Sequence, residues 1–196
     1  MTVHFLIPEE RHAPLLLDWR TRPDIADKML SDVAPDLDRH MEWFRRCASR
    51  TDYVHRLLCV DGTPVGYVSI TITHAAWRIA TLGTLVGEDQ ARTGAAVTFF
   101  AYCLNHIFYT LGMRKVVNQI LGSNERVWKG QEIIGYRLVG THRDHVLKNG
   151  RAEDLHIYEM ARADWTARRR RFGVYEDMDG TVCDEEPDGG SPSTDR

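Results

Sequence analysis

A loop between two regular elements carries the residues whose types and spacing could do chemistry. Residues 84–96 pass from a β-rich segment through Gly94, Ala95 and Ala96 into an amphipathic run over 97–108. The first turn of a helix has N–H groups without intrahelical partners, and the helix dipole adds positive potential there. Because small residues let a phosphate approach the backbone closely, this loop is expected to bind a pyrophosphate. A tight strand-to-helix turn without a ligand would show the same pattern.

Two common nucleotide-binding signatures are missing from this loop. No Gly-Lys-Ser/Thr follows it, as a P-loop requires, and Gly-x-Gly-x-x-Gly is absent. The elements around the loop must therefore indicate which anion it binds.

The composition is that of an ordinary soluble protein with one core. The chain has 196 residues, of which 43% are hydrophobic and 27% charged, which suits one domain of catalytic size. No apolar run approaches the roughly 18 residues of a membrane helix, and residues 1–8 do not resemble a signal peptide. A cytoplasmic protein without a membrane partner is expected. The four cysteines have neither metal-ligand nor redox spacing, so no metal is expected.

The charge is divided unevenly along the chain. Residues 176–196 contain eight acidic residues and one arginine, so the preceding residues are net basic by four. This acidic tail has few apolar groups to bury and is expected to be disordered outside the domain. The basic cluster at residues 168–171 could contact nucleic acid, but a solvated helix end with an intramolecular partner is favoured. No nucleic-acid partner is expected.

Hydrophobic periodicity predicts alternating elements that must position the loop. Asp61-Gly62 and Asn149-Gly150 are typical of tight hairpin turns. Strands are predicted over 3–7, 55–60, 65–74, 77–86, 116–121, 136–146 and 153–161, and helices over 9–20, 37–48, 93–111 and 124–134, with a short helix or turn ending at residue 29.

This order of elements resembles the Gcn5-related N-acetyltransferase (GNAT) superfamily over about residues 1–165. In that family the central strand and helix read hydrophobic-x-Val, four residues, Arg/Gln-x-x-Gly-x-Gly/Ala. Val86, Gly94 and Ala96 fall in register with this motif. The resemblance implies an α/β (α+β) fold with a twisted, mixed, mostly antiparallel sheet of about seven strands and about four flanking helices. It also implies acetyl-CoA as cosubstrate.

One position of this motif departs from the family. Ala91 stands where Arg or Gln is usual, and either flanking residue, Gln90 or Arg92, could supply the polar contact. The resemblance places residues 166–175 in a basic helix end or linker, after the acetyltransferase domain.

A second block, over residues 123–136, resembles the family pattern Asn-x-x-Ala-x-x-x-Tyr-x-x-x-Gly-Phe. Asn124 matches the cofactor-contacting residue, and Gly135-Tyr136 matches the aromatic exit of the helix. Gln131 stands where many members have a tyrosine that protonates the departing thiolate, which an amide cannot do.

The N-terminal third is similar to members that acetylate UDP-linked 4-amino-4,6-dideoxy sugars in nonulosonic (pseudaminic) acid pathways. An aromatic face suits a ring or base, and a guanidinium suits a phosphate. Alternatively, Trp19 packs in the core and Arg20 pairs with Asp24. The residues that carry this resemblance, and hence the expected acceptor contacts, are Trp19, Arg20, Asp24, His40 and Trp43.

The family chemistry requires an oxyanion site, a base and an acid. In the family, an irregularity in the central strand exposes backbone N–H groups that bind the oxyanion. By position, residues 84–86 are expected to supply these N–H groups here. His74 could accept the amine proton, although a strand-end His is often structural. Tyr136 is the candidate acid, with a packed core aromatic as the alternative. The expected cofactor contacts are Thr84, Leu85, Val86, Gln90, Ala91, Arg92, Thr93, Gly94, Ala95, Ala96, Asn124 and Gln131.

Three functions remain open from the sequence. The first is direct acetyl transfer from acetyl-CoA to the 4-amino group of a UDP- or dTDP-linked sugar. The second is transfer to a protein N-terminus, as in the ribosomal-protein branch, or to a polyamine. The third is a non-catalytic domain that binds coenzyme A. The expected partner is a small-molecule amine, and the chain could form a homodimer.

Overall fold

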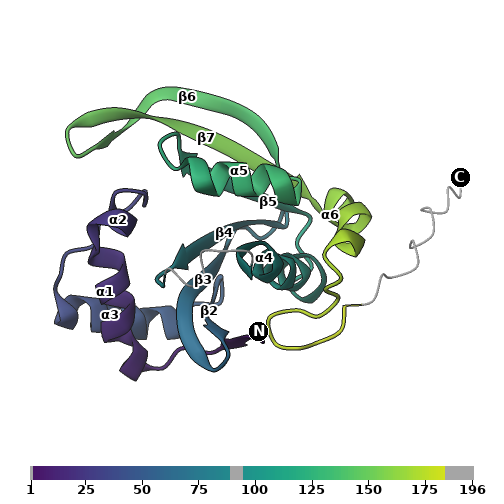
Figure 1. The fold of residues 1–196 in the computed structure, drawn as a ribbon, viewed down its shortest axis with the longest axis horizontal. Helices are drawn as coiled ribbons and strands as arrows, with labels where there is room; N and C mark the ends of the chain where they lie inside the picture. Colours follow the sequence, from purple (N-terminus) through teal and green to yellow (C-terminus); the bar gives the residue numbers. More distant parts are fainter. Residues whose placement is uncertain (1, 89–94, 184–196) are drawn as a thin grey trace, which may run out of the picture.

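One seven-stranded sheet runs through the molecule in the order β1-β2-β3-β4-β5-β7-β6 (Figure 1). The structure is a computed structural model that describes residues 2–88 and 95–183. Only the β4–β5 pair is parallel, so the predicted mixed, mostly antiparallel sheet is confirmed. The strands are β1 (Val3–Leu6), β2 (Tyr53–Val60), β3 (Thr63–His74), β4 (Ile79–Val86), β5 (Lys115–Leu121), β6 (Arg137–Lys148) and β7 (Arg151–Ala161).

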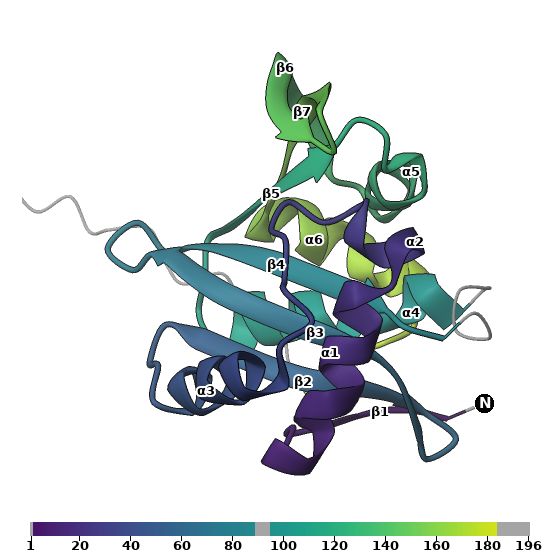
Figure 2. The same cartoon turned by 90° about the vertical axis from the view of Figure 1, so that its left-hand side faces the viewer.

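Helices cover both faces of this sheet. Figure 2 shows α1 and α3 in front of β2 and β3, with α4 behind them. Six α-helices are described, two more than the four expected. The two additional helices, α2 and α6, are short. None of the described helices combines the length and apolarity needed to cross a bilayer. The helices are α1 (Ala13–Thr21), α2 (Pro23–Ala26), α3 (Leu37–Ala48), α4 (Ala95–Asn105), α5 (Glu125–Ile134) and α6 (Arg162–Arg168), with short segments η1 (Glu10–His12), η3 (His106–Thr110) and η4 (Arg169–Arg171).

The two faces of β2 contribute to two separate cores because successive side chains point to opposite sides. Leu57 and Cys59 pack with α1 and α3, whereas Leu58 packs with α4. Strand alternation therefore divides the buried residues into a small core beside α3 and a larger one beside α4.

Both predicted hairpin turns form with the backbone that their sequences favour. Asp61 and Gly62 have φ of 48° and 84°, and Asn149 and Gly150 have φ of 50° and 75°. Two consecutive positive φ angles match the twist of antiparallel strands. These turns join β2 to β3 and β6 to β7.

The C-terminal segment differs from its prediction. Trp165 is fully buried, and its Nε1 donates to Asn105 at 2.9 Å. The side chain of Asn105 in turn donates to the carbonyls of Val174 and Glu176. Asp177, like Met178 and Cys183, is buried against the α4 side of the sheet. The expectation that the tail leaves the domain at residue 176 is therefore wrong for residues 176–183, and residues 184–196 lie outside the described chain.

The basic cluster at residues 168–171 does have an intramolecular partner. Arg169 is buried, donates to the carbonyl of Cys183, and lies 4.6 Å from the ring of Tyr109 and 4.9 Å from that of Tyr175. Cation–π contacts and a carbonyl acceptor offset the cost of burying this guanidinium. The cluster ties the C-terminal segment to the domain.

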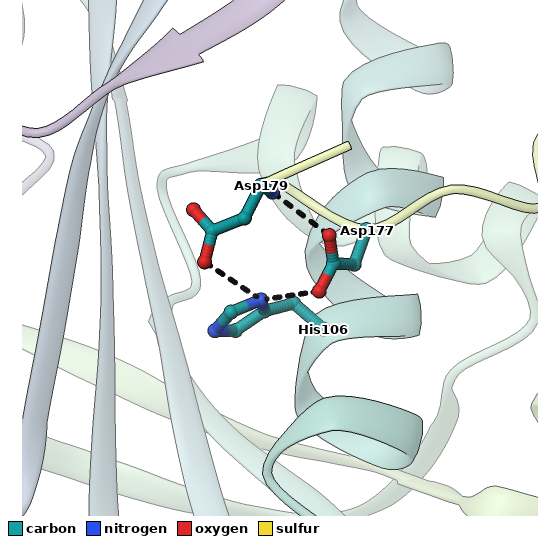
Figure 3. A group of neighbouring side chains, drawn as sticks. All are labelled: His106, Asp177 and Asp179. Carbon is teal, nitrogen blue, oxygen red and sulfur yellow. Dashed lines mark hydrogen bonds and ion pairs between the residues drawn. The ribbon is translucent and has the colours of Figure 1, made fainter. Parts of the chain in front are cut away.

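A cluster of three side chains, here called the clasp, holds the C-terminal segment to the domain. It consists of His106, Asp177 and Asp179 (Figure 3). Asp177 Oδ2 accepts from His106 Nδ1 (3.0 Å) and Thr110 Oγ1 (2.6 Å). Its Oδ1 accepts from the N–H groups of Asp179 (2.8 Å) and Thr181 (2.9 Å). Protein donors thus occupy both oxygens, which fits a structural clasp better than a metal site.

The clasp should make the free energy of unfolding depend on pH through Asp177. Burial raises the pKa of Asp177, but the hydrogen bonds from Thr110, Thr181, Asp179 and His106 outweigh burial and lower it. A lowered folded-state pKa adds stability above the unfolded value of 3.8, and this is lost as pH falls through the folded value. We expect Asp177→Asn to reduce the free energy of unfolding by about 1–3 kcal/mol at pH 7.

Urea denaturation of both proteins at pH 7 and at pH 3 measures this effect. The gap between wild type and Asp177→Asn should narrow at pH 3. Asp18→Asn, at an exposed position, is the control and should change stability by less than about 0.5 kcal/mol at pH 7. Equal losses for both variants at pH 7 would contradict the clasp.

Candidate active site

Two neighbouring pockets meet at the middle of the sheet, where β4 and β5 separate. The first, here the α3 pocket, has a volume of about 470 Å³ and lies between β3, β4, α3 and residues 29–36. The second, here the α5 pocket, has a volume of about 500 Å³ and lies between β4, α4 and α5. Thr84 and Leu85 line both pockets. A group bound in one pocket can therefore meet a group bound in the other at these two residues.

The separation of the strands exposes backbone at this meeting point. β4 pairs with β5 only at Ile79 and Ala80. Further along, Leu82 N–H donates to the side chain of Asn118 (2.9 Å) rather than to a strand. Because N–H groups alternate between the edges of a strand, the N–H of Thr84 faces the same gap. It is placed to donate to a developing oxyanion.

This geometry corrects two details of the expected oxyanion site. β4 keeps its register with β3 from Leu82 to Val86, so the irregularity is a divergence of two strands rather than a bulge. Leu85 pairs with Tyr67, and alternation turns its N–H toward β3. Its side chain lines the pockets, whereas the N–H of Thr84 faces the gap between β4 and β5.

The α5 pocket is mostly apolar. Phe99, Phe100, Val127 and Ile134 form its apolar walls. Asn124, the N-cap of α5, lies at its polar end, where its Nδ2 donates to the carbonyl of Lys28 (3.3 Å). An apolar pocket beside a helix N-terminus suits a ligand that has both an apolar and an anionic part.

The α3 pocket is lined by charged side chains of both signs. Arg20, Arg39 and Arg46 line it together with Asp32 and Asp36. Both carboxylates already have partners within the protein. Asp32 pairs with Lys148 from the β6–β7 turn, and Asp36 caps α3 by accepting from the N–H of Arg39 (3.0 Å).

Arg20 extends from the end of α1 into the α3 pocket. Its Nη2 donates to the carbonyl (3.1 Å) and hydroxyl (3.0 Å) of Ser31, and its buried Nε has no hydrogen-bond partner among the described residues. The alternative in which Arg20 pairs with Asp24 is wrong, because Asp24 pairs with Arg22 (3.2 Å). The guanidinium of Arg20 therefore lines the pocket, and its Nε, which has no partner in the described part of the chain, is buried beside it.

His40 and Trp43 lie in the same pocket, as expected for acceptor contacts. Their rings stack with centroids 4.9 Å apart, and His40 Nε2 is buried without a partner among the described residues. Burial, and then the charge of Arg20, lower the pKa of His40. The pocket thus holds a neutral imidazole beside an aromatic ring.

Two other expected acceptor contacts lie elsewhere. Trp19 is 1% exposed in the smaller core, and its Nε1 donates to Glu88 (2.8 Å). A ring packed on both faces cannot stack on a ligand, so this prediction is wrong and the core alternative is right. Asp24 lines the α5 pocket instead of the α3 pocket.

Neither expected proton-transfer residue reaches a pocket. His74 is exposed at the far end of β3, where its ring lies 4.7 Å from that of Trp77. Tyr136 is buried in the larger core, and burial raises its pKa. The prediction of these residues as base and acid is therefore wrong in position, since neither lines the α3 or the α5 pocket.

The remaining cofactor residues divide into three groups. Thr84, Leu85, Val86 and Asn124 line the α5 pocket. Gln131 is buried in α5 and does not line it. Ala95 and Ala96 begin α4, and the remaining predicted contacts lie outside the described residues; these are Gln90, Ala91, Arg92, Thr93 and Gly94.

Sequence reasoning missed the aromatic floor of the α3 pocket. Tyr53 and Tyr67 line it from β2 and β3, and His55 bonds to the Tyr67 hydroxyl (2.8 Å). The spacing of two between Tyr53 and His55 puts both on one face of a strand, and this was the available signal. Only the pairing of β2 with β3 brings Tyr67 beside them.

Comparison with known proteins gives a consistent answer about the family. The model of an acetyltransferase (GNAT) domain matches residues 5–137, more than half of the chain. None of the curated proteins matches this sequence.

Solved structures share the fold at low sequence identity. The spermidine N-acetyltransferase of Vibrio cholerae, in complex with CoA and spermine, superposes with a TM-score of 0.79 at 14% identity, over 84% of this chain and 98% of that one. A mutant form of the spermidine/spermine N-acetyltransferase SpeG from the same organism gives 0.75 at 14% identity, over 85% and 97%. At this identity the likeness concerns the fold.

Proposed function

The chain belongs to the GNAT acetyltransferase family, and we propose that it transfers the acetyl group of acetyl-CoA directly to the amine of a small molecule. The observation that carries this proposal is the pair of pockets that share Thr84 and Leu85. Acetyl-CoA occupies the α5 pocket, with its thioester at Thr84. The amine enters through the α3 pocket and attacks the thioester carbonyl from the opposite side. Holding both reactants at one point supplies much of the rate enhancement.

Acetyl transfer then needs little beyond positioning and electrostatics. The amine nitrogen forms a bond to the carbonyl carbon, and the oxyanion accepts a hydrogen bond from Thr84 N–H. Collapse of this intermediate breaks the carbon–sulfur bond, releasing the amide and coenzyme A. No covalent enzyme intermediate is needed.

A polyamine is the first acceptor to consider, since two structures of similar fold are spermidine or spermidine/spermine N-acetyltransferases, one of them in complex with spermine. Asp32 and Asp36 supply carboxylates at the α3 pocket for a cationic chain. A polyamine there would have to compete with Lys148, the present partner of Asp32.

A nucleotide-linked amino sugar is the second candidate. Arg20 keeps a buried N–H without a partner among the described residues, and Arg39 and Arg46 add positive charge to the pocket. A phosphate would satisfy such donors. The stacked pair of His40 and Trp43 offers an aromatic surface beside them.

Thiol release from acetyl-CoA separates these possibilities. Spermidine, a UDP-4-amino-4,6-dideoxy sugar and a short peptide with a free N-terminus are offered in parallel, and release with the first or second identifies the acceptor. If only the peptide releases thiol, the small-molecule proposal fails. If no amine releases thiol while acetyl-CoA raises the melting temperature, the domain binds the cofactor without catalysis.

Gly130 provides a direct test of the cofactor pocket. It lines the α5 pocket from within α5, and a Cβ added there meets nothing within 4 Å. Gly130→Leu therefore adds side-chain volume at the pocket from an unobstructed Cβ. It also removes a helix-weakening glycine, which favours folding by up to about 1 kcal/mol. We expect the Kd for acetyl-CoA, measured by calorimetry, to rise at least about tenfold, equivalent to 1.4 kcal/mol.

Gly130→Ala is the matched control, because it makes the same helix improvement with one methyl group. Its acetyl-CoA affinity should stay within about threefold of wild type, under 1 kcal/mol. Wild-type affinity in Gly130→Leu would place acetyl-CoA outside the α5 pocket.

A further inference from the structure

Three side chains form a hydrogen-bonded chain along the floor of the α3 pocket. The Tyr67 hydroxyl lies 2.8 Å from His55 Nδ1 and 3.0 Å from the Tyr53 hydroxyl. The rings of His55 and Tyr67 meet edge to face with centroids 5.8 Å apart, which aims the hydroxyl at the imidazole. Tyr53 and Tyr67 line the pocket, whereas His55 lies behind them.

This chain of hydroxyls lies close to the point where the two pockets meet. Tyr67 is the direct cross-strand partner of Leu85, so both side chains project from the same face of the sheet. Leu85 lines both pockets, next to the backbone N–H of Thr84. An amine that reaches the thioester through the α3 pocket therefore passes the Tyr67 hydroxyl.

The surroundings of His55 keep its ring neutral at rest, so that Nδ1 can accept the hydrogen bond from the Tyr67 hydroxyl. Burial, and then the charge of Arg56, lower the pKa of His55 to about 4. Arg56 itself is held by a two-pronged pair with Asp179, at 2.9 and 3.0 Å. Burial and the adjacent Tyr53 raise the pKa of Tyr67. Tyr67 therefore keeps its own proton at rest and can pass one on only while it receives another.

We propose that Tyr67 takes the proton from the attacking amine and hands its own hydroxyl proton to His55, so that the pair serves as the base of the reaction. This inference rests on the proposed acetyl transfer. Tyr67 is the catalytic residue, because it contacts the amine, and His55 acts through it. Tyr53 holds the Tyr67 hydroxyl in place.

The proton balance of the step is complete. After attack, the nitrogen of the tetrahedral intermediate carries one proton too many. That proton moves to Tyr67 Oη as the Tyr67 proton moves to His55 Nδ1, which leaves an imidazolium and a neutral tyrosine. The carbon–sulfur bond then breaks and coenzyme A leaves as a thiolate. The imidazolium proton returns through Tyr67 or solvent, and the thiolate takes up a proton to give the thiol.

His40 is the competing base in this pocket, but its setting is less suitable. Its Nε2 has no partner to which a proton could pass among the described residues. The Tyr67–His55 pair moves the charge away from the pocket, behind the floor.

Removing the hydroxyl oxygen of Tyr67 tests this proton transfer from the amine through Tyr67 to His55, here called the relay. With whichever amine of the three above gives thiol release, Tyr67→Phe should lower kcat by about 100-fold and leave the KM for acetyl-CoA within about twofold. His55→Gln, which keeps a hydrogen-bond acceptor but takes no proton, should show a similar fall. Tyr109→Phe is the matched control, because it removes a tyrosine hydroxyl that bonds Thr166 and lines neither pocket; its kcat should stay within about twofold of wild type. Unchanged melting temperatures establish that the variants fold.

Isotope effects distinguish proton transfer from a structural role. A plot of kcat against deuterium content should curve for the wild type, because two protons move together, and should become linear in Tyr67→Phe. A wild-type kcat in Tyr67→Phe or His55→Gln, or a linear plot in the wild type, overturns the relay while leaving acetyl transfer intact.

Nitrogen NMR of the labelled histidines tests the relay without any acceptor. His55 should be neutral at pH 7 with its proton on Nε2, and its Nδ1 signal should shift in Tyr67→Phe. A proton on Nδ1 would make His55 the donor and would refute the relay. Failure of every amine to release thiol is a separate result, which counts against the proposed function.

Discussion

Replacing Arg20 with alanine is expected to raise the KM for the amine acceptor by about 10- to 100-fold. Hydrogen bonds to charged groups contribute about 1.5–3 kcal/mol, and every 1.4 kcal/mol is a factor of ten. Arg20 carries a buried N–H without a partner among the described residues, and it also holds Ser31 on the pocket rim. Both contributions are lost in Arg20→Ala. Steady-state kinetics with each substrate varied in turn measures the change.

The KM for acetyl-CoA should change less than about threefold, under 1 kcal/mol, because Arg20 lines only the α3 pocket. Arg46→Ala is the matched control, since Arg46 lines the same pocket but its side chain is 64% exposed and pairs with Glu42. An exposed ion pair contributes at most about 1 kcal/mol, so the acceptor KM should rise no more than about fivefold.

Arg20→Lys refines the interpretation. It keeps the charge but loses the planar fork of the guanidinium. If the acceptor brings a phosphate or carboxylate, Arg20→Lys should recover only part of the loss. Equal KM changes for both substrates in Arg20→Ala would mean that the side chain supports the fold rather than the acceptor.

Replacing Trp165 with alanine is expected to reduce the free energy of unfolding by about 3–5 kcal/mol, the usual range for a large buried aromatic. Trp165 is 0% exposed in the larger core. Its loss also leaves Asn105 Oδ1 without its donor. Because the Asn105 side chain holds the carbonyls of Val174 and Glu176, those contacts should weaken as well. The C-terminal segment should loosen together with the core.

Denaturant unfolding and amide hydrogen exchange check this second effect. Trp77→Ala is the matched control, because Trp77 is 63% exposed, and it should change stability by less than about 0.5 kcal/mol. Exchange should speed up at Asp179 and Thr181, whose N–H groups donate to Asp177. Unchanged protection there would show that the segment docks independently of Trp165.

Local patterns predicted the regular elements well because their causes are local. Helix α3 begins and ends where apolar periodicity places it, at Leu37 and Ala48, since burial of one helix face sets that period. Gly135 ends α5 with a φ of 115°, a conformation that glycine adopts without steric cost. The Asp61-Gly62 turn likewise follows from the backbone freedom of its own residues.

The site residues were harder to predict because their roles depend on distant partners. Trp19, expected at the acceptor, is covered by segments that include Gly87, where an added Cβ would lie 2.2 Å from the indole. His74 lies on the correct strand but at its far end, beyond both pockets. The acidic composition of residues 176–196 could not reveal that Asp177 meets His106 in the core.

The sequence by itself determined that this is an acetyltransferase domain with a mixed seven-stranded sheet, because element order and the motif around Val86 depend on residues near one another in the chain. The resemblance of two N-terminal segments to one branch of the family grouped Arg20, His40 and Trp43, and these three side chains line one pocket. Only the tertiary structure decided where β4 leaves β5, which exposes Thr84 between two pockets. It alone joined Tyr67 to His55, because strand register, and not sequence spacing, sets which side chains meet across a sheet.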